Sequence, residues 1–144
     1  MIDHTVWTAR LASAASALNG RAYDMAQYLR DAPAWTITPA AYVHPLIDEP
    51  DDHVSLHDQA VSVTAAVLLV VAATGTVDQA FSALYNVRDS VRSALVGWTP
   101  AGAFSAALFA GGQAEEFLTA DPKAGLPATL VWRDLYRTQY LLTF

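Results

Sequence analysis

The stretch FSALYNVRDSVRSALVGWTPAGAFSAALFAGG, residues 81–112, decides the fold class. Its apolar residues recur three and four positions apart: Phe81, Leu84, Val87, Val91 and Leu95. This spacing places them on one side of an amphipathic helix. The helix is predicted to end at Gly97, because glycine readily adopts the left-handed conformation that terminates helices, and Pro100 prevents its resumption. An apolar strand is expected to follow.

The strongest strand prediction lies directly before this helix. Residues 59–73 carry no charge and are rich in β-branched side chains, and Thr74-Gly75-Thr76 supplies turn chemistry after them. Thr76 and Gln79 have the spacing of a capping box, in which two side chains satisfy free N–H groups at a helix start. The sequence therefore predicts a central strand, a turn and a helix over 77–96.

Two further strands are expected after the helix, over residues 104–118 and 129–144. The loop over 119–127 is short and rich in Gly, Pro and Asp, so antiparallel pairing follows. One alternating set of the last strand is mainly aromatic: Trp132, Asp134, Tyr136, Thr138, Tyr140, Leu142 and Phe144. The other set contains Arg133 and Arg137, which predicts a half-buried strand whose arginines face solvent or a partner.

The first third of the chain gives weaker patterns. A helix is expected over 3–18, with one shared apolar face: Trp7, Leu11, Ala14 and Leu18. A shorter helix is expected over 23–30, with these side chains directed inward: Met25, Tyr28 and Leu29. Residues 35–43 include Pro39, which is typical of an edge or broken strand. Residues 44–52 hold two prolines and four acids, which predicts a mobile acidic loop.

Together these elements predict an α+β fold in a single domain over residues 1–144, with a mixed, mainly antiparallel sheet packed against one long helix and an N-terminal helix. A chain of 144 residues buries about 68–70% of its unfolded surface. The absence of cysteine excludes disulfides and thiolate metal sites. The net charge of −6 gives no attractive footprint for nucleic acid.

No membrane partner is expected. The N-terminal residues carry Asp3 and lack a basic start followed by an apolar run, so no secretory signal is predicted. Residues 60–77 are uncharged and long enough for a membrane helix. Their valines, threonines and Gly75 favour a buried strand instead.

No pattern predicts a catalytic, cofactor-binding or metal-binding residue. His53 and His57 would approach a common metal in a helix, but in a strand their rings would lie about 13 Å apart, so exposed histidines are the favoured interpretation. Glu115 and Glu116 are adjacent, so in a strand they face opposite ways and cannot act as an acid and base pair.

Three other features are given structural interpretations. Gly111-Gly112 lacks the third glycine of a phosphate loop, which favours a bulge or a close backbone approach. Arg88 and Arg92 share a helical side that nearby acids dilute, which favours a solvated face. Trp98 follows the helix end and is either a core residue or an interface anchor, and the sequence leaves both open.

These segments bear a family resemblance. The run VRSALVGWTP over residues 91–100, the Phe109-Ala110-Gly111-Gly112 turn and the closing WRDLYRTQY over 132–140 resemble the tail terminator proteins of long-tailed bacteriophages. That family is represented by minor tail protein U of lambdoid phages. The resemblance covers roughly residues 41–144 and also includes the strand over 61–71. It carries no chemical signature, so it transfers no site residue.

The resemblance implies a structural virion protein, assembled in the host cytoplasm, that forms a homohexameric ring at the head-proximal end of the tail tube. Such a ring ends tube polymerisation and joins the tube protein to head completion proteins, without enzymatic activity or cofactors. DNA passes through its lumen without specific binding, which the negative net charge suits. The acids over 48–52 are the candidate lumen-facing or tube-facing element.

Three other roles remain open from the sequence. A head–tail connector or adaptor subunit would also form a ring without chemistry. A monomeric or dimeric ligand-binding α+β domain would need a deep apolar pocket with convergent polar groups, whereas a ring needs complementary lateral surfaces. A metal hydrolase would use His53 and His57.

Overall fold

The computed structural model of the chain describes residues 2–35, 37–44, 46–53 and 55–144, with the backbone alone at Asp52 and His53. The elements follow in the order α1 (His4–Ala14), the 3-10 turn η1 (Ser16–Leu18), β1 (Ala22–Asp24), α2 (Met25–Asp31), β2 (Ala40–Val43), β3 (Ile47–His53), β4 (Asp58–Ala72), α3 (Val77–Leu95), β5 (Leu108–Leu118) and β6 (Thr129–Thr143).

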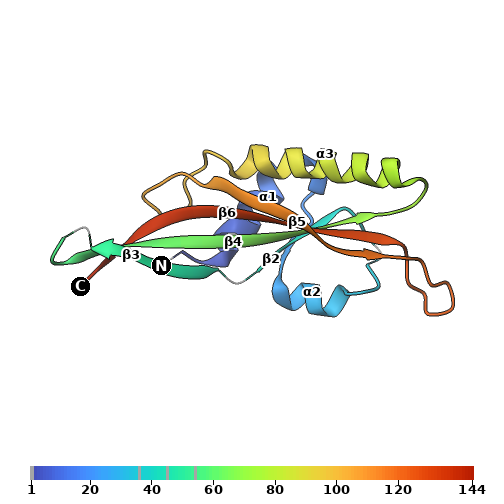
Figure 1. Ribbon diagram of the computed structural model, residues 1–144, viewed down its shortest axis with the longest axis horizontal. Coiled ribbons are helices and arrows are strands. Elements are labelled where there is room, and N and C mark those ends of the chain that lie inside the picture. Colours follow the sequence, from blue (N-terminus) through green and yellow to red (C-terminus); the bar gives the residue numbers. More distant parts are fainter. Residues whose placement is uncertain (1, 36, 45, 54) are drawn as a thin grey trace.

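The strands form one mixed sheet. Five of them lie in the order β1-β2-β4-β6-β5, and β3 pairs with the part of β4 that β2 leaves free. β1 runs parallel to β2, and the other named strands pair antiparallel. The long strands β4 and β6 run along the molecule, with α3 on one side and α2 on the other (Figure 1). The predicted α+β class is confirmed.

The strand and helix that decide the fold lie where the sequence predicts them. β4 and α3 match the expected ranges to within one residue at each end. Thr76 Oγ1 accepts a hydrogen bond from the Gln79 backbone N–H at 3.2 Å, and Gln79 Oε1 accepts one from the Thr76 N–H at 2.9 Å. The capping box is therefore confirmed. Gly97 follows the helix with a φ of 83°, in the region that glycine adopts without steric cost.

The main core lies on the sheet face that carries α1 and α3, here called the inner face. Side chains from β4, such as Val63 and Val67, pack there with Leu84 and Val91 of α3. Tyr136 and Tyr140 of β6 belong to the same core. The middle of the alternating set of the last strand is thus buried, because alternate strand residues share one face. Leu142 and Phe144 at its end are 44% and 60% exposed.

Trp98 completes this core from beyond the end of α3. Its ring meets the ring of Trp7 edge-on, with 5.4 Å between the centroids. The Arg10 guanidinium lies 5.5 Å from the centre of the Trp98 ring. Because Trp7 is fully buried on α1, Trp98 packs where α1 and α3 meet. Trp98 is partly buried against the core, so the side of its ring that meets Trp7 is a core contact.

α2 lies on the opposite face of the sheet, here called the outer face, and covers one end of it (Figure 1). A second apolar cluster lies beneath it, with Trp35, Tyr42 and Leu68 buried and Tyr28 of α2 packed against them. The prediction that Leu29 points inward is wrong, because its side chain is 72% exposed. Neighbouring helix residues point about 100° apart, so a helix that directs Tyr28 to the sheet turns Leu29 away.

Two strand predictions need correction. The edge or broken strand expected over 35–43 is instead the interior strand β2 over Ala40–Val43, which lies between β1 and β4. Pro39 precedes β2 and removes no hydrogen bond from its ladder. The predicted acidic loop contains the strand β3, because β4 extends past β2 and offers a free edge. Pro50 fits there since β3 itself is an edge strand.

The remaining segments follow the predictions more closely. The helix expected over 3–18 is present but divides into α1 and η1 at Ala15. β5 begins at Leu108, four residues later than expected, and pairs antiparallel with β6. Within the described part of the chain, no helix is long and apolar enough to cross a membrane.

Replacing the capping threonine tests the start of α3. Thr76→Ala removes the acceptor for the Gln79 N–H and is expected to lower the free energy of unfolding by about 1 kcal/mol. Thr76→Ser keeps the hydroxyl and is the matched control. Urea denaturation followed by circular dichroism measures both variants, and equal stabilities for Ala and Ser would contradict the role of the cap.

Candidate functional surfaces

Among the described residues, the histidine and acidic side chains do not gather into a metal site. No group of three His, Asp or Glu side chains in the described part of the chain is placed to hold a metal ion. The side chain of His53 lies outside the described residues, and His57 is exposed. Glu115 forms an ion pair with Arg133 at 2.8 Å.

A buried ion pair joins α3 to β6. The Asp134 side chain is completely buried and that of Arg88 is 12% exposed. Arg88 Nε and Nη2 donate hydrogen bonds to the two carboxylate oxygens of Asp134 at 3.0 and 2.9 Å. Trp132 Nε1 donates to Asp134 Oδ1 at 2.9 Å. Three donors and a full positive charge thus compensate the buried carboxylate.

The prediction that Arg88 and Arg92 form a solvated helix face is wrong. Arg88 belongs to the buried ion pair, and its guanidinium also lies 4.5 Å from the centre of the Trp132 ring. The Arg92 guanidinium lies 4.3 Å from the centre of the Phe109 ring. Both arginines therefore fasten α3 to the sheet strands beneath it.

The glycine pair allows β5 to approach this ion pair. The pairing of β5 with β6 shifts register between Phe109 and Gly111, so the predicted bulge is confirmed. A Cβ atom at Gly112 would collide with Asp134 Oδ1 and would lie 3.0 Å from both Arg88 Nη2 and Trp132 Nε1. The predicted close approach is confirmed at Gly112.

Beyond α2, the outer face carries an ordered polar network. Ser62 Oγ and Gln139 Nε2 donate to Asp51 Oδ2 at 2.7 and 2.9 Å. These hydrogen bonds, that of Ser62 first, hold the pKa of Asp51 below its ordinary value. Arg137 lies 3.3 Å from Glu49 in an exposed ion pair. The arginine is thus on the outer face, as the alternation of β6 predicts.

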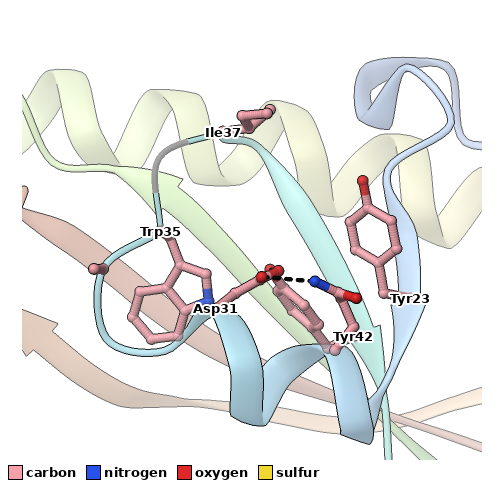
Figure 2. A pocket seen from close by; sticks show the side chains of 7 residues that line it. Tyr23, Asp31, Trp35, Ile37 and Tyr42 are labelled. Carbon is pink, nitrogen blue, oxygen red and sulfur yellow. Dashed lines mark hydrogen bonds between the residues drawn. The ribbon is translucent and has the colours of Figure 1, made fainter.

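An aromatic pocket of about 260 Å³ opens between α2, β1 and the segment that leads into β2. Tyr23, Trp35 and Tyr42 line it together with Asp31 (Figure 2). Tyr42 Oη donates to Asp31 Oδ2 at 2.8 Å, and Gln27 Nε2 donates to Asp31 Oδ1 at 2.7 Å. Burial, and then the bond to Asp31, raises the pKa of Tyr42 far above its ordinary value, so the phenol remains a donor.

The β5–β6 hairpin ends in a compact tip at one end of the molecule (Figure 1). Asp121 and Leu126 exchange backbone hydrogen bonds of 2.8 and 2.9 Å across it. Asp121 Oδ1 accepts the backbone N–H groups of Lys123 and Ala124 at 3.2 and 3.3 Å. Lys123 is exposed. Within the described residues, no hydrogen bond or ion pair engages its ammonium group.

The comparisons with known proteins identify the family. The sequence model of the family described as phage tail terminator protein matches residues 1–143. The chain therefore belongs to the phage tail terminator family, as the resemblance implied, and is a structural protein of the virion tail. None of the curated proteins compared with the sequence matches it.

Among solved structures, a chain of the "Virion of native gene transfer agent (GTA) particle" has a similar fold. The two superpose with a TM-score of 0.66, and the match covers 96% of this chain and 93% of that chain at 16% sequence identity. At this identity the likeness concerns the fold. It agrees with the α+β arrangement described above.

Breaking the buried ion pair from one side tests its contribution. Arg88→Met leaves the carboxylate of Asp134 buried without a cation and is expected to lower the free energy of unfolding by about 3–5 kcal/mol. The double variant Arg88→Met/Asp134→Asn removes the charge while keeping an acceptor for Trp132, so it is expected to recover part of the loss. Thermal and urea unfolding measure both. A double variant less stable than the single one would contradict this account.

Proposed function

We propose that this chain forms a homohexameric ring at the head-proximal end of the phage tail tube. There it ends tube polymerisation and joins the tube protein to the head completion proteins. The observation that carries the proposal is the match of the tail terminator family over residues 1–143. The role is structural and needs no enzymatic activity or cofactor.

The two lateral edges of the sheet differ from each other, which supports ring formation. A closed ring of identical subunits needs two unlike surfaces that complement each other around one axis. β5 pairs with β6 along one side only, so its other side is an open edge of eleven residues. The opposite border of the sheet is made of the shorter strands β1 and β3. The chain thus has two different lateral borders.

The charge of the chain suits a channel for DNA. A net charge of −6 repels phosphates, which lowers the tendency of DNA to stick to a pore wall. Within the proposed ring, we place the acidic strand β3 on the inner wall or on an axial face. Asp48 accepts a hydrogen bond from Tyr140 Oη, and Asp51 accepts two, from Ser62 Oγ and Gln139 Nε2. These bonds hold both carboxylates in place on β3.

The mass of the assembly tests the ring. The purified chain at micromolar concentration, alone or with tail tube ends, is expected to give a species of six times the 15.5 kDa subunit mass. Native mass spectrometry or mass photometry measures it. A monomer in both conditions would contradict the proposal. A ring that binds head connectors but not tube ends would favour the adaptor role instead.

The position of β3 in that ring is a separate prediction. A reconstruction of the ring by electron cryo-microscopy is expected to place Asp48 and Asp51 on the lumen wall or an axial face. These acids would then line the DNA path or meet the tube. Asp48→Asn/Asp51→Asn is therefore expected to change the fraction of tails that join to heads and to leave the mass of the ring unchanged. Both acids on the outer rim would contradict this placement.

A further inference from the structure

We propose that Lys123 of one copy inserts into the aromatic pocket of the neighbouring copy, where its ammonium group meets Asp31. The proposal deepens the proposed function and rests on it, since the contact repeats around the ring. In this subunit contact, a lysine from the hairpin tip of one copy binds to aromatic ring faces and a carboxylate of the next copy.

The pocket has the chemistry of a site for a cation. The faces of tyrosine and tryptophan rings attract ammonium groups, and Tyr23, Trp35 and Tyr42 surround the space next to Asp31 (Figure 2). Each carboxylate oxygen of Asp31 accepts one neutral donor, and each can accept a second. Within the described residues, no ion pair engages this carboxylate. The nearby Arg30 donates to Gln27 Oε1 at 2.6 Å instead.

Other charges on the outer face favour the same occupant. Burial raises the pKa of Tyr28, which packs on this cluster, and the negative charges of Glu116 and Glu115 raise it further. Glu116 and Glu115 therefore lie close enough to α2 for their charges to act on this cluster, although Glu115 is paired with Arg133. Negative charge that is left without a cation favours a cationic partner over an anionic one. An acidic or purely apolar side chain would leave Asp31 without a cationic partner.

Lys123 is the available cation of this chain. It is the sole lysine in the sequence. The seven arginines all contact protein groups in the structure: Arg10, Arg21, Arg30, Arg88, Arg92, Arg133 and Arg137. Among the described lysine and arginine side chains, Lys123 alone presents an exposed positive charge without such a contact.

The hairpin tip that carries Lys123 is held in a defined turn by its own hydrogen bonds. The Asp121–Leu126 bridge and the capping of two N–H groups by Asp121 hold the turn before any partner binds. A preformed turn loses little conformational entropy on docking. A projecting tip and a concave pocket are unlike surfaces, and contacts between unlike surfaces close cyclic rings. The exposed Ile37 at the pocket border, 65% exposed, adds apolar surface for the lysine stem.

Zero-length cross-linking tests the contact directly. A carbodiimide couples an amine to a carboxylate that touches it, and Lys123 supplies the sole side-chain amine of the chain. Rings assembled from equal amounts of ¹⁵N-labelled and unlabelled protein are treated with the carbodiimide, digested and analysed by mass spectrometry. The expected product joins the Lys123 peptide of one copy to the Asp31 peptide of another, with mixed isotopes.

Three variants separate charge from fold. Lys123→Ala is expected to raise the protein concentration at which half of the rings dissociate by roughly tenfold, as for the truncation of an interface anchor. Lys123→Arg keeps the charge, so it is expected to preserve the ring while abolishing the cross-link. Asp31→Asn is expected to weaken the ring to a similar degree as Lys123→Ala. Thermal unfolding of each isolated subunit establishes that the variants are folded.

The outcomes distinguish this contact from the ring itself. A wild-type ring in which Lys123 couples to another carboxylate, or only to Asp31 of its own copy, would overturn the contact and leave the ring standing. Rings of Lys123→Ala that dissociate at the wild-type concentration would do the same. A wild-type chain that remains monomeric with and without tube ends would overturn both proposals.

Discussion

The antiparallel pairing of β4 with β6 is the constraint on which the rest of the structure depends. It runs without a register shift from Asp58 opposite Thr143 to Ala72 opposite Thr129. Because strand side chains alternate, this register decides which residues face α3. A slip by one residue would turn Asp134 and Tyr136 of β6 to the outer face. The buried ion pair, the glycine that lets β5 approach it and the polar outer face all follow from this pairing.

Local sequence patterns predict the central strand and the long helix. The elements that they do not predict depend on pairing between segments that are distant in the sequence. The β-branched run of β4, the capping box at Thr76 and the stop at Gly97 are encoded within a few residues, so the sequence alone predicts them. The strand β3 depends on the free edge of β4, which no local pattern reveals. Its acids look like loop residues until Asp48 and Asp51 meet donors from β4 and β6.

The functional surfaces were less predictable for the same reason. A single acid in the aromatic set of β6 was a signal for a buried carboxylate, but its partner Arg88 lies 46 residues away. The pocket combines Tyr23, from the short helix expected over 23–30, with Trp35 and Tyr42, which both lie in the segment 35–43 that was predicted as an edge or broken strand. By contrast, the family was predictable, because its short runs are contiguous in the sequence and the family match extends over nearly the whole chain.

The chain combines a sheet with two unlike borders, a negative net charge, an exposed lysine at a hairpin tip and an aromatic pocket beside α2. We propose that these features build the ring that terminates the tail tube. Electron cryo-microscopy of assembled tails, decorated with an antibody fragment against this chain, tests the claim most directly. The account predicts one six-fold ring of labelled density at the head-proximal end of the tube. Label along the tube or at its distal tip would contradict it.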